Sequence, residues 1–168
     1  MGELAATLAR LLAAAGPLPV RWADDEGEHW LVVPDRERLR AARPAAAIGF
    51  FGQARATVDH GPLLALEESI VGRADALGGL LAYYNVGLSR GGWGNLVLIA
   101  PGATVLAAMP DHAVAVGRAA AHYHSIRLHT ADLPEGVAAP AALALQTTTL
   151  FDFDTAPTRR TVRVHPAT

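Results

Sequence analysis

The chain has 168 residues, of which 51% are apolar, and a formal net charge of −2. That length suits one well-packed domain, and the composition is typical of a soluble globular protein. The fourteen basic residues are scattered arginines, which argues against nucleic-acid binding. The absence of cysteine excludes disulfides, thiolate metal sites and a cysteine nucleophile.

Leucines at helical spacing predict a first helix over residues 3–15, which ends before Gly16-Pro17. Glu3 and Arg10 interrupt the apolar run and no charged segment precedes it, so we expect an amphipathic helix and no signal peptide. No apolar run approaches the ~18 residues that a membrane span needs. We therefore expect a cytoplasmic protein without a membrane partner.

The next residues predict a hairpin and a second helix. Two strand-like runs, at about 19–23 and 28–33, flank a turn-rich segment of acidic residues and glycine. A short charged helix then starts at Pro34-Asp35 and ends before Pro44. Residues 1–43 form an N-terminal extension in this interpretation.

From residue 45 onward, strand and helix patterns follow one another in a regular order. The predicted elements are strands at 45–55, 79–88, 95–100 and 125–133, a helix at 63–74 and a second helix from Pro110. Residues 89–94, SRGGWG, read as the turn of a hairpin between the second and third strands. Strand–helix–strand–strand–helix–strand is the ferredoxin-like order, so we predict an α+β fold with a ferredoxin-like antiparallel sheet over residues 45–132. Residues 140–168 add a C-terminal hairpin around Pro157, and the whole chain makes one domain.

The predicted core sheet has apolar side chains on both faces. Strand alternation predicts Ile48, Phe50, Leu96 and Leu98 on one face and Phe51, Val97 and Ile99 on the other. Two helices cover one face, and the second face must also be buried. Dimerisation into an α/β barrel would bury it, so we expect a homodimer.

Three histidines, His122, His124 and His129, lie at the junction between the second core helix and the last core strand. Five side chains share one face of that helix at 3–4 spacing, and we expect this face to pack against the sheet: Met109, Ala113, Val116, Ala120 and Tyr123. On the helical wheel His124 lies at the edge of this face, and His122 points away beside Arg118. One histidine as a helix cap with the others at the surface or in the core is one interpretation; a metal or haem-iron ligand is the other. A three-histidine zinc site is disfavoured, because His122 and His124 diverge on a helix.

Other polar residues suggest a pocket. Strand alternation places Tyr83 and Asn85 on one face, where they either line a pocket or are a tyrosine and an amide paired across strands. Asp59 is expected to cap the first core helix, and His60 could lie at a pocket mouth.

The element order, and a helix that ends in the string Ala120-Ala121-His122 before the last core strand, resemble the antibiotic-biosynthesis and haem-degrading monooxygenases. These proteins belong to the dimeric α/β-barrel superfamily, together with chlorite dismutases and aldoxime dehydratases. The resemblance implies a haem cofactor with an axial histidine. The string matches His122 to that ligand, whereas the spacing to the strand fits His124 equally well. The resemblance also matches Gln53 to a polar amide that haem-degrading members carry on the first strand.

The chain departs from haem-degrading members at the end of the third strand. Those members carry a tryptophan there, where this sequence has Ile99-Ala100, and Trp93 was assigned to the preceding turn. We therefore expect a retained haem cofactor, as in a haem-dependent oxidoreductase or lyase that acts on a small molecule. The candidate residues that hold and protonate the substrate are Gln53, Tyr83, Asn85 and His129.

Two other functions stay open. A cofactor-free monooxygenase or cyclase of the same fold would position an aromatic or polyketide-like substrate and move protons through His129, Tyr83 or Asn85. A non-enzymatic ligand-binding or interaction domain would use the C-terminal hairpin as a contact surface.

Overall fold

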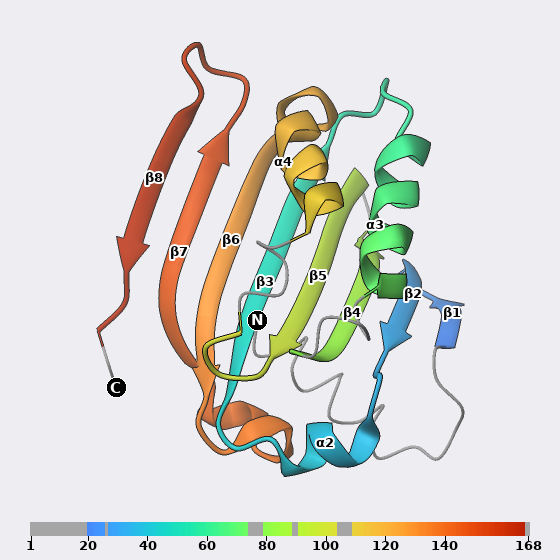
Figure 1. The fold of residues 1–168 in the computed structure, drawn as a ribbon. Helices are drawn as coiled ribbons and strands as arrows, with labels where there is room; N and C mark the ends of the chain where they lie inside the picture. The colour runs from blue at the N-terminus through green and yellow to red at the C-terminus, as the bar shows by residue number, and fades with distance from the viewer. Residues whose placement is uncertain (1–19, 26, 74–78, 89–90, 104–108, 167–168) are drawn as a thin grey trace.

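The computed structural model describes residues 20–25, 27–73, 79–88, 91–103 and 109–166, and Figure 1 shows its fold. The helix that we expected over residues 3–15 lies outside the described residues. Among the rest, no helix combines the length and the apolarity that crossing a bilayer requires.

The described residues form an α+β fold in which eight antiparallel strands make one sheet in the order β1-β2-β4-β5-β3-β6-β7-β8. The strands are β1 (Val20–Asp24), β2 (Gly27–Val32), β3 (Ala45–Ala54), β4 (Leu80–Leu88), β5 (Gly92–Ile99), β6 (Tyr123–Leu133), β7 (Ala144–Asp152) and β8 (Arg159–Val164). The helices are α2 (Arg36–Ala41), α3 (Gly61–Arg73) and α4 (Pro110–His122), with two short 3-10 turns, η3 (Gly136–Ala138) and η4 (Pro140–Ala142). Each element predicted between residues 19 and 166 is therefore present.

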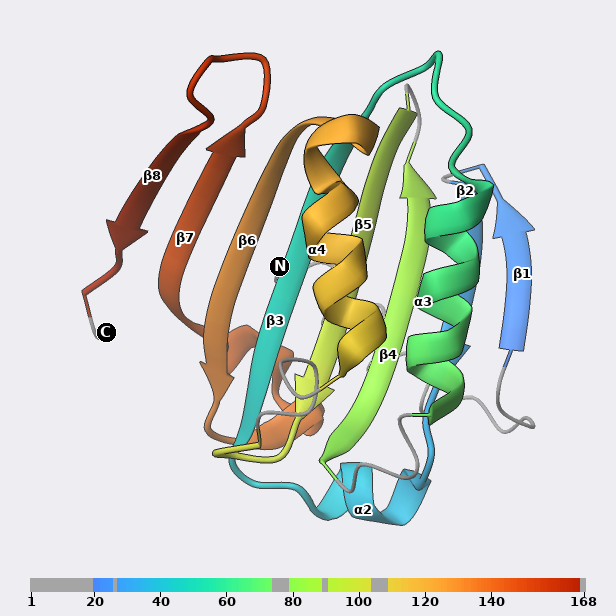
Figure 2. The same ribbon diagram turned by 45° about the horizontal axis from the view of Figure 1, so that its top comes forward.

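Both predicted hairpins extend the central sheet. The pair β1–β2 continues it beyond β4, and the pair β7–β8 continues it beyond β6. Helices α3 and α4 lie side by side across one face of the sheet, as Figure 2 shows, and α2 lies at the lower end (Figure 1). Ser69 of α3 donates a hydrogen bond to Asp111 of α4, with an oxygen–oxygen distance of 2.7 Å. The sheet thus has one face with two helices and an opposite face, which we call the helix face and the far face.

The register corrects our assignment of side chains to these faces. Ile48 of β3 pairs with Val97 of β5, so Ile48 and Phe50 lie on the helix face with Val97. Phe51 lies on the far face, on the side of Leu96 and Leu98. The predicted grouping was wrong because alternation within one strand fixes which residues share a face, but only the pairing register relates the faces of two strands.

The far face is buried over β2, β4 and β5 in a single chain. Leu31, Leu96 and Leu98 are almost fully buried there, in one cluster with Leu39 of α2. The homodimer stays a prediction, but a second subunit is not needed to remove these leucines from water.

The buried face of α4 differs from the face that the helical wheel of the sequence predicts. Its more buried positions are His112, Ala115, Ala119 and His122, whereas Val116 is 60% exposed. The predicted face included Tyr123, which is the first residue of β6 and not part of the helix. Counting Tyr123 as helical displaced the predicted buried face around the helix axis. The prediction therefore placed His122 toward solvent, although only 7% of its surface is exposed.

Replacing Gly27 by alanine should destabilise the β1–β2 turn. Gly27 has φ = +145°, and a Cβ atom there would lie 1.8 Å from the carbonyl oxygen of Gly87 on β4. The strained backbone and the overlap together should lower the free energy of unfolding by at least about 1–3 kcal/mol, measured by urea denaturation. Gly117→Ala in α4 is the matched control: nothing lies within 4 Å of its added methyl group, and it should stabilise by about 0.5–1 kcal/mol. Equal effects of the two variants would contradict the close approach.

Candidate functional site

A cleft of about 450 Å³ opens between α3 and the strands β1, β2, β4 and β5. The residues that line it are Arg21, Trp22, Ala23, Glu28, His29, Trp30, Leu64, Glu67, Glu68, Asn85 and Trp93. Concave sites of this size, with apolar walls and a few polar groups, are where small molecules bind.

All three tryptophans are among the residues that line the cleft. The strand register places Trp30 and Trp93 on the helix face, whereas the Trp22 ring stacks on His29 on the far face. Our prediction placed Trp93 in a turn, but it belongs to β5 and pairs with Gly52 of β3 and Gly87 of β4. The glycine-rich sequence around Trp93 suggested a turn, whereas the strand continues through it. At the mouth of the cleft, the guanidinium of Arg21 lies 4.3 Å from the ring centre of Trp30 and forms an ion pair with Glu68 at 2.8 Å.

A partly buried carboxyl group, that of Glu67, lies in the wall of the cleft. The Tyr83 hydroxyl donates a hydrogen bond to its Oε1 atom. Nδ2 of Asn85 donates to the same oxygen at 2.5 Å, and Nδ2 of Asn95 lies 3.4 Å from the Tyr83 hydroxyl. The carboxylate on α3 is therefore held by two donors from β4, and Asn95 of β5 donates to one of them, the Tyr83 hydroxyl.

Burial sets the protonation behaviour of this group. It raises the pKa of Glu67 above the usual 4.5, and the hydrogen bonds from Tyr83 and Asn85 oppose that rise without cancelling it. Burial, together with the Glu67 charge, raises the pKa of Tyr83 well above 10.0. The tyrosine thus remains a hydrogen-bond donor near neutral pH, while the carboxyl group is poised to accept or release a proton closer to neutrality than an exposed glutamate.

The four predicted substrate-handling residues do not meet at one site. Tyr83 and Asn85 share the helix face, as predicted, and Asn85 lines the cleft. His129 lies on the far face, where its ring contacts Phe51 edge-on, and Gln53 alternates onto the same face of β3. His129 Nδ1 lies 2.9 Å from Oγ1 of Thr148, so its contacts are to β7 and not to the cleft.

His122 and His124 also lie outside the lining of the cleft. His122 faces His60, which precedes α3, with 3.4 Å between the two Nδ1 atoms. Asp59 accepts a hydrogen bond from the Gly61 amide at 2.9 Å and so caps the start of α3, as predicted. Among the residues that the structure describes, no group of three or more His, Cys, Asp or Glu side chains could hold a metal ion.

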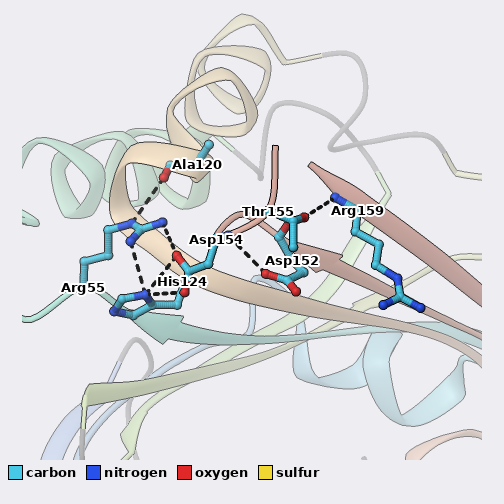
Figure 3. A network of polar contacts seen from close by, with 7 residues as sticks. All are labelled: Arg55, Ala120, His124, Asp152, Asp154, Thr155 and Arg159. Carbon is cyan, nitrogen blue, oxygen red and sulfur yellow. Dashed lines mark hydrogen bonds and ion pairs between the residues drawn. The ribbon is translucent and has the colours of Figure 1, made fainter. Parts of the chain in front are cut away.

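His124 belongs to a network that ties α4, β6 and the β7–β8 turn together, drawn in Figure 3. Nδ1 of His124 lies 2.9 Å from Asp154, whose carboxylate also binds Arg55 at 2.8 Å. Arg55 lies 3.2 Å from the same ring nitrogen and also donates to the Ala120 carbonyl. Arginine only donates, and the aspartate contact is the shorter one, so we assign the Nδ1 proton of His124 to the bond with Asp154. Hydrogen bonds from His124 and Arg55 lower the pKa of Asp154.

A second polar network lies on the far face beneath β1 and β2. The rings of Trp22 and His29 stack with centroids 4.6 Å apart. His29 joins the Tyr84 hydroxyl to the Asp24 carboxylate, at 2.8 Å on either side. These residues fix the β1–β2 hairpin, and through it the tryptophan walls of the cleft.

Tyr84→Phe should test that supporting role. It removes the buried hydroxyl beside His29 and leaves a ring nitrogen without that partner, which should cost about 1–3 kcal/mol of unfolding free energy in a denaturant titration. Thr161→Val on the exposed strand β8 should change it by less than about 0.5 kcal/mol. An unchanged free energy of unfolding in Tyr84→Phe would show that the network does not stabilise the hairpin.

The sequence prediction missed Glu67 and the three tryptophans as site residues. A signal for Glu67 existed: it lies four residues after Leu63 and three before Ile70, within the apolar stripe of α3. A charged residue inside such a stripe is buried and needs partners. The tryptophans come from β1, β2 and β5, which only the tertiary structure brings together.

Comparison with protein-family models, with curated proteins and with solved structures found no match to this chain. The geometry of the site is therefore the basis for its function.

Proposed function

We propose that this protein is a cofactor-independent enzyme that binds a small, flat, largely apolar molecule in the cleft and moves a proton through Glu67. One observation carries the proposal: a partly buried carboxyl group with a raised pKa, held by Tyr83 and Asn85, lies in the wall of a cleft with tryptophans in its lining. Buried carboxyl groups tuned toward neutral pH act as general bases or acids.

The walls define the substrate class. Trp30, Trp93 and Leu64 contribute aromatic and apolar surface to the lining, which favours an aromatic or polycyclic substrate over a sugar or a peptide. Arg21 at the mouth supplies a cation to a phenolate or carboxylate of that substrate. The expected chemistry is proton abstraction beside a carbonyl or ring, as in an isomerase, a cyclase or a cofactor-free monooxygenase.

The strand order supports the ferredoxin-like interpretation of the core. Strands β3, β4, β5 and β6 lie in the order β4-β5-β3-β6, which is the order of ferredoxin-like sheets. This supports the resemblance to dimeric α/β-barrel proteins at the level of the core. A homodimer in the cytoplasm remains part of the proposal, and light scattering at micromolar concentration tests it.

A generic proton-transfer substrate tests Glu67 without knowledge of the natural one. Nitrobenzisoxazole is flat and aromatic, and its ring opens when a base removes the ring C–H proton and the N–O bond breaks, giving a coloured phenolate. We expect the protein to accelerate this opening by about 100-fold or more over buffer, with a rate that rises with pH as Glu67 ionises. Glu67→Gln should remove the acceleration.

Controls separate binding from chemistry. Glu37→Gln changes an exposed carboxylate on α2 and should leave the rate unchanged. Trp30 and Trp93 line the cleft on the helix face, so ligand binding should change the tryptophan fluorescence of the wild type and of Glu67→Gln alike. Acceleration that survives in Glu67→Gln would refute Glu67 as the base. Tryptophan fluorescence that does not respond to any flat aromatic ligand would refute ligand binding in the cleft.

Haem binding through His124 is the second candidate, and one observation favours it. Histidines that ligate a metal donate their other ring N–H to a carboxylate or carbonyl, and the bond from His124 to Asp154 has this form. It leaves Nε2 of His124 as the lone-pair nitrogen. Since 45% of the His124 side chain is exposed, it is also the more accessible of the two histidines that the resemblance implies.

The Soret band tests this candidate. If haem binds through His124, His124→Ala should abolish or strongly shift the band, whereas His165→Ala after β8 should leave it intact. Loss of the band in His122→Ala alone would transfer the ligand to His122. A wild-type spectrum in both cluster variants would refute a histidine ligand in this cluster.

A further inference from the structure

The two histidines at the meeting point of α3 and α4 have the geometry of a metal-ligand pair. His60 directly precedes α3, and His122 is the last residue of α4. Their Nδ1 atoms are 3.4 Å apart and their ring centres 5.3 Å apart. The 3.4 Å separation is longer than the range of about 2.7–3.2 Å that N–H···O hydrogen bonds prefer. Two nitrogens bound to one tetrahedral zinc ion at about 2.0–2.1 Å lie about 3.3–3.4 Å from each other.

The contacts of His60 determine which ring nitrogen carries its proton. Nε2 of His60 lies 3.0 Å from the carbonyl oxygen of Arg55, an atom that only accepts hydrogen bonds. The proton of the neutral ring is therefore on Nε2, and the lone pair is on Nδ1, toward His122. A hydrogen bond from the outer nitrogen to a backbone carbonyl is the usual support of a metal-ligating histidine.

His122 is suited to the same role. Its side chain is buried at the end of α4, 7% of the residue being exposed, and its Nδ1 atom lies toward Nδ1 of His60. A neutral imidazole carries one proton, so with that proton on Nε2 the lone pair of Nδ1 is available to a metal. The carboxylate of Asp59, the residue before His60, would attract a cation to the pair.

We propose that His60 and His122 bind one divalent first-row metal ion of the zinc class through their Nδ1 atoms, with water in the remaining positions. Two imidazoles without thiolates or a cage of carboxylates favour zinc, copper, nickel or cobalt over magnesium and calcium. The metal would clamp the start of α3 to the end of α4. This site is separate from the cleft and from the proposed haem ligand His124.

Titration of the full-length protein with Zn²⁺ against a chromophoric chelator tests the site. We expect one ion per chain with a Kd in the micromolar range, and Zn²⁺ should raise the unfolding temperature by mass action. His60→Gln and His122→Gln should each weaken binding by about tenfold or more and abolish the thermal shift. His165→Gln, which lies at the far end of the sheet, should change neither.

Three results would overturn the proposal. One is the absence of stoichiometric Zn²⁺ binding by the wild type. Another is binding that persists in both His60→Gln and His122→Gln. The third is loss of binding in His124→Gln while His60→Gln binds normally. If His122→Gln does not fold, His60→Gln decides the question, because His60 is only partly buried and its replacement is expected to leave the fold intact.

Discussion

Leu98→Ala should lower the free energy of unfolding by about 2–5 kcal/mol, measured by urea denaturation. Leu98 is completely buried on the far face of β5, in the same cluster as Leu31 and Leu96. Truncation removes its transfer free energy and leaves a cavity that the surrounding structure fills only in part. Val164→Ala is the matched control, because Val164 is 73% exposed, and it should cost less than about 0.5 kcal/mol.

The concentration dependence of this effect distinguishes two ways of burying the far face. If one chain buries Leu98, as here, the loss of stability is the same at every protein concentration. If a second subunit supplied that burial, the unfolding midpoint of both proteins would rise with concentration, and the variant would shift the oligomeric state. A large concentration dependence at this position would contradict burial within one chain.

Glu67→Gln should raise stability at pH 7 while it removes the proposed proton transfer. The pKa of Glu67 is raised in the folded protein, chiefly by burial, so ionising the carboxyl group costs free energy only in the fold. Glutamine keeps an oxygen that accepts from Tyr83 and Asn85 but cannot ionise. We expect a gain of about 1 kcal/mol, seen as a rise in Tm by a few degrees.

The pH dependence gives the sign of this effect. A carboxyl group with a raised folded pKa contributes its full stability below the unfolded pKa, near 4.5, and loses it as the pH rises through the folded pKa. The advantage of Glu67→Gln should therefore vanish below about pH 4.5 and grow toward neutral pH. An advantage that is constant with pH would show that packing, and not ionisation, causes it.

The sequence predicts the elements of this fold well because each strand and helix carries its own pattern. The runs at residues 45–54 and 80–88 alternate or remain apolar between turn residues, and Pro110 starts α4 where it is expected. The relations between elements are harder to predict. The pairing of Ile48 with Val97 depends on a register that neither strand encodes alone. The buried face of α4 was predicted wrongly because Tyr123, the first residue of β6, was counted as helical.

The candidate site was predictable only in part, for the same reason. Tyr83 and Asn85 share a face through strand alternation, which is a local property. Glu67, Trp30 and Trp93 approach them only when α3 packs over β2, β4 and β5, so their role depends on long-range contacts. His60 and His122 are 62 residues apart, and they meet because α3 starts where α4 ends.

The last strand of the sheet has a consequence for the behaviour of the protein in concentrated solution. Strand β8 forms one border of the sheet, is exposed along its whole length, and carries arginines at positions 159, 160 and 163. An open border can recruit a strand from another molecule and start a fibre, and a dense row of like charges opposes such growth. Polyanions or high salt that mask these arginines should therefore promote aggregation of folded protein without lowering its unfolding temperature.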